Sequence, residues 1–269
     1  MKDDLGNRMK SYEKNSKALL MRKIPVIIRV DGKSFHRFCK RFEKPYDLYF
    51  NTYMNAVMKY LCENIQGAKF AERHSDEISI LVTDMDSIHT DAYFGYQVQK
   101  ISSIVSSMAT AELCRQMMQE KIDLSHVGCL DDWVDNPNYL SIYEDWPSFD
   151  CRCFNLPISE VENYFWWRLK DAVRNSINML AQSKFSHKEL QGVSCDQMQE
   201  MLFSKCGINW NNLNQGQKSG FLCFKTSIKK VVEKGPNAGL EFDRNEWTIN
   251  YSPSSMEMFK NIIKNILTD

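Results

Sequence analysis

The sequence has no long hydrophobic run, no internal repeat and no low-complexity segment. No apolar stretch approaches the ~20 residues of a membrane-spanning helix, and the amino terminus MKDDLGNRMK lacks the apolar core of a signal peptide. Glycine and proline are few, at 11 and 7 of 269 residues, and no cluster of them marks a flexible linker. We therefore predict a single domain over residues 1–269, with no membrane association, in the cytoplasm.

The chain also lacks an excess of charge and a pattern of paired cysteines. Lys plus Arg and Asp plus Glu both number 34, so the net charge is zero and any contact with nucleic acid must come from local basic patches. The nine cysteines are odd in number and, apart from Cys151 and Cys153, widely spaced, which is not the pattern of a disulfide framework. A hydrophobic fraction of 43% is sufficient for a sizeable core.

The spacing of apolar residues predicts both helices and strands, and hence an α+β fold. The β-branched segment 24–30 is typical of a buried strand, and Asp31 and Gly32 follow it. Ser159 and Glu162 have the spacing of a capping box at the start of a helix. The predicted helices cover 7–22, the segment from Pro45 to Ile65, 91–119, 159–180, 194–205 and 254–267. The predicted strands cover 24–30, 68–73, 78–82, 149–156, 220–232 and 240–250.

The order of the predicted core elements is β-α-β-β-α-β, which is the ferredoxin-like arrangement of polymerase and nucleotidyl cyclase palms. We expect this palm to span about residues 20–190, with a C-terminal lobe of helices and strands over about 191–269. The turn-like segment 234–237 would join the last two strands, and the acidic stretch 123–148 is predicted to be irregular. The fold by itself hosts many functions.

Acidic residues stand at the ends of two strands that are expected to be neighbours. Asp31 follows the first strand, and Asp76 and Glu77 lie in the predicted bend 74–77 of the next hairpin. Carboxylates that meet at one sheet edge repel each other unless a cation lies between them. Mg²⁺ prefers oxygen ligands, and two such ions promote in-line displacement at phosphorus. Gly32 would allow a close approach of the backbone, so its carbonyl is a further candidate ligand.

A basic segment follows the first of these acids. Residues 33–45 contain five Lys or Arg, hydroxyl and imidazole groups, and three phenylalanines. Backbone donors and cations beside a metal site are what a triphosphate requires. A plain solvated loop is the alternative interpretation.

These motifs resemble the tRNA-histidine guanylyltransferase family and its guanylyltransferase-like (3′-5′ polymerase) branch. The resemblance covers about residues 7–225. It rests on the segments Arg29–Phe38, Lys44-Pro45, His74–Glu77, Phe149–Arg152, Phe165–Asp171 and Met201–Trp210.

The resemblance implies a nucleotidyltransferase that uses two Mg²⁺ ions and nucleoside triphosphates, GTP and ATP, to extend the 5′ end of a tRNA. Asp31, Gly32 and Asp76 would bind metal, and Lys44 would assist activation of the 5′ end. A tetramer is also implied. The residues that would contact the nucleotide are Asp31, Gly32, Lys33, Ser34, Phe35, His36, Ser75 and Asp76.

The chain departs from the family at one motif. Where the enzymes that act on tRNA-histidine have His-Ile-Asn-Asn-Leu-Tyr-Asn, this chain has the segment Val173–Met179, with Val173 at the histidine position. This departure favours templated repair of 5′-truncated tRNAs over dedicated guanosine addition to tRNA-histidine.

Basic residues away from the acids are candidates for RNA contact, with solvated surface as the plainer interpretation. They are Lys184, His187, Lys188 and Arg152. Two other functions use the same elements: a palm-fold nucleotidyl cyclase, which needs no RNA surface, and a tRNA-binding chaperone without turnover.

Overall fold

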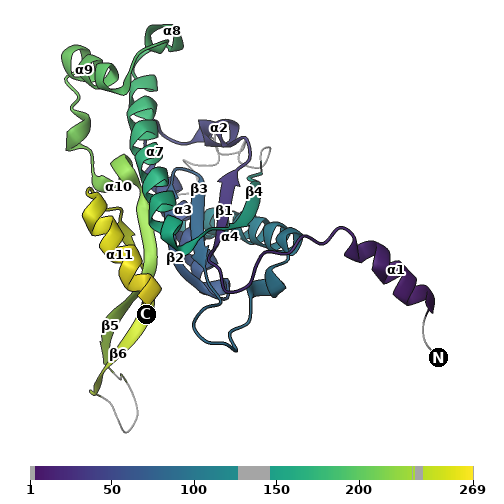
Figure 1. The fold of residues 1–269 in the computed structure, drawn as a ribbon. Helices are drawn as coiled ribbons and strands as arrows, with labels where there is room; N and C mark the ends of the chain where they lie inside the picture. Colours follow the sequence, from purple (N-terminus) through teal and green to yellow (C-terminus); the bar gives the residue numbers. More distant parts are fainter. Residues whose placement is uncertain (1–3, 127–145, 232, 234–238, 269) are drawn as a thin grey trace.

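The computed structural model describes residues 4–126, 146–231, 233 and 239–268, and its centre is a six-stranded sheet (Figure 1). The strand order is β4-β1-β3-β2-β5-β6, and every neighbouring pair is antiparallel. The strands are β1 (Val26–Gly32), β2 (Ala68–His74), β3 (Glu77–Val82), β4 (Phe149–Asn155), β5 (Phe221–Val231) and β6 (Glu241–Tyr251). The order of the first four strands is that of the predicted palm, and β5 and β6 continue the same sheet.

Helices cover both faces of the sheet, so the core has two layers of side chains. On one face, α3 (Leu48–Asn64) and α4 (Val98–His126) pack against Val26, Ile28 and Val30 of β1. On the other face, α7 (Val161–Gln182) and α11 (Met256–Thr268) pack against Ile27. Alternate residues of β1 thus enter opposite layers, which explains its uninterrupted β-branched run.

The C-terminal part of α7 extends beyond the sheet and carries a small third cluster. Ile177 and Leu180 pack there with Met198 and Leu202 of α9 (Cys195–Cys206). The 3₁₀ helix Trp210–Asn212 and α10 (Gln215–Ser219) lead back to β5, and α8 (His187–Leu190) lies at the far end of α7. Among the described residues, no helix has the length and apolar character needed to cross a bilayer.

Three predictions for the N-terminal half need correction. The first helix, α1, covers Asp4–Lys14 and not 7–22, because Leu19 leaves it to form a bridge with Gln97. The strand β1 extends through Gly32, so Asp31 belongs to the strand. The hairpin turn consists of residues 75–76 alone, since His74 pairs with Glu77 as the last rung of the ladder.

The predictions around the later helices were also partly wrong. Ser159 lies in a 3₁₀ helix, Ile158–Glu160, and α7 begins at Val161 without a side-chain cap, so the capping box does not form. The helix predicted over 91–119 is a 3₁₀ helix, Tyr93–Tyr96, followed by α4, which extends into the stretch predicted to be irregular. Most of that acidic stretch, and the turn 234–237, lie outside the described residues.

Candidate active site

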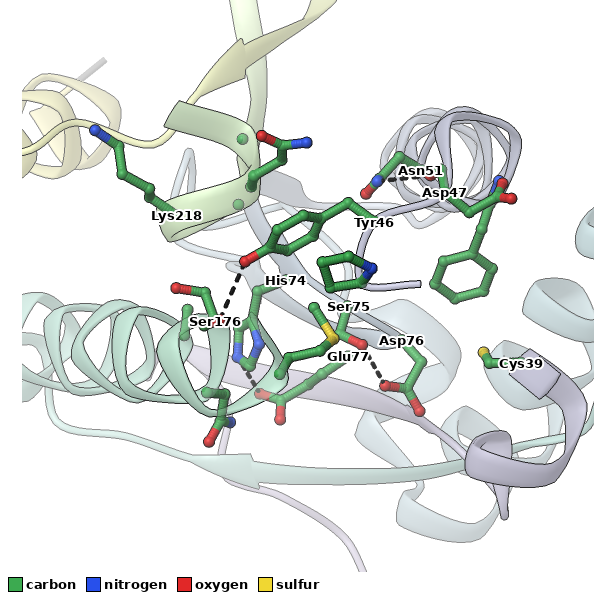
Figure 2. Close-up of a pocket in the computed structure, with 18 of the residues that line it drawn as sticks. Cys39, Tyr46, Asp47, Asn51, His74, Ser75, Asp76, Glu77, Ser176 and Lys218 are labelled. Atoms are coloured by element: carbon green, nitrogen blue, oxygen red, sulfur yellow. Dashed lines mark hydrogen bonds and ion pairs between the residues drawn. The ribbon is translucent and has the colours of Figure 1, made fainter. Parts of the chain in front are cut away.

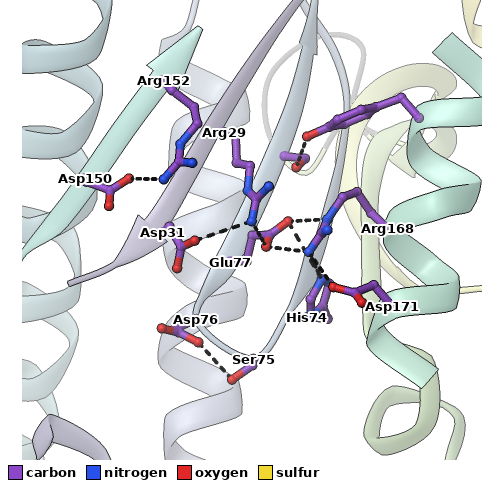
Figure 3. A network of polar contacts seen from close by, with 12 residues as sticks. Arg29, Asp31, His74, Ser75, Asp76, Glu77, Asp150, Arg152, Arg168 and Asp171 are labelled. Carbon is purple, nitrogen blue, oxygen red and sulfur yellow. Dashed lines mark hydrogen bonds and ion pairs between the residues drawn. The ribbon is translucent and has the colours of Figure 1, made fainter. Parts of the chain in front are cut away.

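The turn between β2 and β3 and the end of β1 lie at one edge of the sheet and bring the predicted acids together. Val30 pairs with Ile78 in the β1–β3 ladder, so Asp31 and Gly32 extend alongside the turn that carries Asp76. A Cβ atom on Gly32 would lie 2.6 Å from Oδ2 of Asp76, which means that only glycine leaves room for this carboxylate. Figure 3 shows Asp31 and Asp76 on the same side of Glu77.

Both burial and a neighbouring charge shift the pKa of the Asp76 carboxyl. Burial raises the pKa of the Asp76 carboxyl, and the negative charge of Asp31 raises it further. The Ser75 hydroxyl donates a hydrogen bond of 3.0 Å to Oδ1 of Asp76 and partly offsets this effect. A cation between Asp31 and Asp76 would remove the repulsion.

The two acids adjoin a cavity of about 620 Å³, the right size for a small ligand (Figure 2). One wall comes from the segment before α3, with Lys44, Tyr46 and Asp47. The opposite wall comes from α7 and α10, with Asn175 and Gln217. The cavity therefore lies between the carboxylate edge of the sheet and the helices α7 and α10.

The segment that contains Lys44 is fixed at both ends. Oδ1 and Oδ2 of Asp47 accept hydrogen bonds from the backbone N–H groups of Phe50 (2.8 Å) and Glu43 (2.9 Å), which caps α3 and closes a loop around Lys44. The Tyr46 hydroxyl donates to the carbonyl oxygen of Ser176 on α7, at 3.1 Å. Lys44 itself is exposed and lines the cavity.

Of the residues predicted to contact the nucleotide, Asp31, Ser75 and Asp76 line the cavity, whereas those of the segment 32–36 lie beside it. Lys33, Ser34 and His36 are exposed, in the turn that leads from β1 into α2 (Phe35–Phe38). The Phe35 ring is buried, with its centroid 4.9 Å from those of both Phe38 and Phe149. A nucleotide contact from Phe35 can therefore involve only its backbone.

The predicted RNA-contacting residues form two separate groups. Lys184, His187 and Lys188 are exposed at the far end of α7 and in α8. Arg152 lies on β4, pairs in register with Arg29, and donates to Oδ1 of Asp150 at 3.0 Å. Arg152 thus belongs to the carboxylate edge and not to the α8 patch.

One acidic residue of this edge, Asp150, was not singled out from the sequence, and another, Glu77, was predicted at the bend of the hairpin. Asp150 lies directly opposite Asp31 in the β1–β4 ladder, and only the strand pairing reveals this. Glu77 is not exposed at the bend but buried and paired with Arg168 of α7 and Arg29 of β1.

His74 borders both the cavity and this buried pair. Burial lowers the pKa of the His74 imidazole to about 3, and the charges of Arg168 and Arg73 act in the same direction. His74 is therefore neutral at physiological pH.

The segment Val173–Met179, where the chain departs from the family motif, is part of α7. Val173 packs on the third apolar cluster, whereas Asn175 and Met179 line the cavity. Ser176 is buried, and its hydroxyl accepts a hydrogen bond of 3.0 Å from the Trp210 indole.

Among the described residues, no three side chains of the His, Cys, Asp or Glu types converge as a closed metal site. A closed zinc site has four such ligands. Mg²⁺ instead takes one or two carboxylates and completes its shell with water and substrate phosphates. Asp31 and Asp76 beside an open cavity fit that second donor set.

Comparison with known proteins identifies the family. A family model described as tRNAHis guanylyltransferase matches residues 6–157. The chain is 27% identical over 266 residues to the "Probable tRNA(His) guanylyltransferase" of Dictyostelium discoideum, with 93% of each chain covered. It is similar to the structure of a bacterial tRNA(His) guanylyltransferase-like protein in complex with ATP, with a TM-score of 0.80, 33% identity and 98% of both chains covered. The corresponding complex with GTP gives a TM-score of 0.76 and 32% identity, with 98% of this chain and 99% of that chain covered. These matches, together with the carboxylate edge and its cavity, show that the chain belongs to the tRNAHis guanylyltransferase family of nucleotidyltransferases.

Proposed function

We propose that this protein repairs tRNAs truncated at the 5′ end, by templated addition of nucleotides in the 3′-to-5′ direction. The observation that carries the proposal is the close approach of Gly32 to Asp76, beside Asp31, at the edge of a cavity about 620 Å³ in volume. The bacterial relatives were solved with ATP and with GTP. Nucleoside triphosphates are therefore the substrates proposed for this cavity, with tRNA as the acceptor.

Two Mg²⁺ ions are the metals proposed for this edge. Asp31 and Asp76 would hold them, with the Gly32 carbonyl as a further ligand. Such a pair activates an attacking hydroxyl and stabilises the leaving oxygen in an in-line displacement. The raised pKa of Asp76 is consistent with a carboxylate that requires a cation to remain ionised beside Asp31.

The proposed reaction exchanges one phosphorus–oxygen bond for another. The 3′-oxygen of the incoming nucleotide forms a bond to the α-phosphorus of a 5′-triphosphorylated RNA end, and the bond from that phosphorus to pyrophosphate breaks. The hydroxyl proton passes to solvent. The protein contributes position and charge. Lys44, which lines the cavity, would face the 5′ end. Lys33, Ser34 and His36, which are exposed beside the cavity, would meet the part of the triphosphate that extends out of it.

The choice of acceptor follows from Val173. An apolar side chain packed on a hydrophobic cluster neither donates a hydrogen bond nor carries charge, so the role of the family's histidine is absent here. If that histidine assists transfer of an activating nucleotide to a 5′-monophosphate, this protein is poor at activation. It still extends ends that already carry a triphosphate.

Pyrophosphate release and the dependence of turnover on RNA separate this proposal from the two alternatives. A nucleotidyl cyclase would act on one small molecule and would gain nothing from RNA. A chaperone would bind tRNA without releasing pyrophosphate, and its affinity for RNA would not depend on the metal carboxylates.

The experiment compares four acceptors: full-length tRNA and tRNA lacking its first nucleotide, each with a 5′-monophosphate or a 5′-triphosphate. Each is incubated with all four nucleoside triphosphates, and both product length and pyrophosphate are measured. We expect the truncated, triphosphorylated tRNA to be extended best. Efficient guanosine addition to full-length, monophosphorylated tRNA-histidine would refute the proposed repair role.

A further inference from the structure

The buried carboxylate of Glu77 is held by two arginines from different elements (Figure 3). Arg168 of α7 donates to both oxygens, from Nε to Oε1 at 2.7 Å and from a terminal guanidinium nitrogen to Oε2 at 2.6 Å. Arg29 of β1 donates to Oε2 at 2.6 Å. Both oxygens of Glu77 are therefore occupied by guanidinium groups, in contrast to the carboxylates of Asp31 and Asp76.

These contacts connect the metal-site acids to each other. Glu77 is the first residue of β3 and directly follows Asp76, so fixing its side chain fixes the end of the turn that carries Asp76. Arg29 also reaches Oδ2 of Asp31 at 3.4 Å. One carboxylate and two arginines thus bridge the two strands that carry the proposed metal ligands.

Arg168 is itself fixed from several sides. It contacts Asp171 on the same helix (3.2 Å) and Nε2 of His74 (3.3 Å), and its side chain is only 5% exposed. About two turns further along, α7 presents Asn175 to the cavity. Arg168 is therefore a direct polar link between the helix that forms the cavity wall and the hairpin that carries Asp76.

We propose that Arg168 is a positioning residue: through Glu77 it holds Asp76 and Asp31 in the geometry that binds metal. This inference rests on the proposed function. A buried, bidentate pair requires the planar fork of arginine, and lysine supplies charge without that fork. Groups that orient metal ligands in this way typically change metal affinity or activity ~10–100-fold when they are replaced.

The test measures Mn²⁺ binding by electron paramagnetic resonance and nucleotide addition in parallel. The variants are R168K and E77Q, with D76N as the reference for loss of the metal site. R115K is the control, because Arg115 makes the same two-pronged contact with Glu112 on α4 (2.7 and 2.6 Å) without lining the cavity. We expect R168K and E77Q to weaken Mn²⁺ binding at least ~10-fold and to lower kcat more than they raise KM for the nucleotide. R115K should match the wild type.

The thermal midpoint is recorded for each variant, because a merely structural role would lower Tm and leave Mn²⁺ binding unchanged. Mn²⁺ affinities of R168K and E77Q within about twofold of the wild type would overturn the inference. That outcome would leave the proposed metal site at Asp31 and Asp76 unaffected. If the wild type bound Mn²⁺ no more tightly than D76N does, that result would instead overturn the proposed function.

Discussion

The Asp76 carboxylate is partly buried and lies near the negative charge of Asp31. The effect of replacing Asp76 by a neutral residue can be measured. Asp76→Asn should lower the rate of nucleotide addition on the order of 10³-fold or more, because it removes a proposed metal ligand. Without metal, the free energy of unfolding should stay the same or rise, since the desolvated carboxylate beside Asp31 is gone. Rates come from extension assays, and stabilities come from urea unfolding in EDTA.

Asp86→Asn is the matched control for this substitution. Asp86 is an exposed acid that pairs with Lys69 at 2.8 Å and does not line the cavity. The substitution Asp86→Asn should leave the rate of nucleotide addition unchanged. An Asp76→Asn protein that retained activity would remove Asp76 from the metal site.

The buried carboxyl of Glu72 predicts how the stability of the fold depends on pH. Glu72 is 1% exposed, and neither carboxylate oxygen has a hydrogen-bond partner. Burial raises the pKa of Glu72 well above its ordinary value of 4.5, and the charge of Glu77 raises it further, although Arg168 opposes the shift. The folded protein thus keeps a proton that the unfolded chain releases, and stability falls as pH rises above 4.5 toward the folded pKa.

Glu72→Gln removes this titration. The difference in unfolding free energy between the variant and the wild type should therefore grow with pH by up to about 1.4 kcal/mol per pH unit. Urea unfolding at several pH values between acid and neutral measures it. Parallel stability curves for the two proteins would show that Glu72 is ionised in the folded state.

The burial of Glu72 could not be predicted from sequence. The period-two pattern identifies β2 as a strand, but it assigns a polar residue to a solvent face. Here helices cover both faces of the sheet, so polar residues of β2 such as Glu72 and Arg73 are buried together with the apolar ones. The positions of Asp31 and Asp76 were predictable because both lie where strands end.

At the scale of elements, the junction of β1 and α2 depends on one glycine. A Cβ on Gly32 would lie 2.3 Å from Cγ of Phe35 and 2.6 Å from Oδ2 of Asp76. Gly32→Ala must displace either the buried ring or the carboxylate. We expect nucleotide addition to fall roughly 100-fold, the effect of a ~1 Å misplacement at a reacting centre.

The control is Gly207→Ala, at the C-terminal cap of α9. Gly207 has a φ of +67° and no neighbouring atom within 4 Å of an added Cβ. This substitution should cost about 1 kcal/mol of stability from backbone strain and leave the rate of addition unchanged. Equal activity in the two alanine variants would contradict the role assigned to Gly32.

The helices α3 and α7 were predicted well because each carries a full apolar period. The short helices α2, α8 and α10 were not predicted, since four or five residues do not establish a helical period. The α10 residues that line the cavity, such as Gln217, were missed for the same reason. Their contact with α7 depends on the path of the chain through the third cluster.

At the scale of the whole molecule, we propose that several copies assemble, as a tetramer. The chain has no net charge, and α1 projects from the body with none of its residues buried (Figure 1). Leu5, Met9 and Tyr12 of this helix are 60%, 45% and 64% exposed. An isolated helix of 11 residues is marginal in water, so a contact with another copy would stabilise it.

Light scattering measures the oligomeric state directly. We expect a mass of four copies, and we expect a smaller mass when Leu5 and Met9 are replaced by Ser. Each replacement removes apolar surface without changing the net charge. A stable monomer of the unmodified chain at working concentration would contradict the proposal.

We propose that base pairing, and not a protein motif, selects the added nucleotide. The measurement uses 5′-triphosphorylated tRNAs that lack the first nucleotide, with each of the four bases in turn opposite the gap. The identity of the nucleotide added is then determined with all four triphosphates present. We expect the added nucleotide to be, in each case, the complement of the opposite base. Addition of guanosine whatever the opposite base would contradict it.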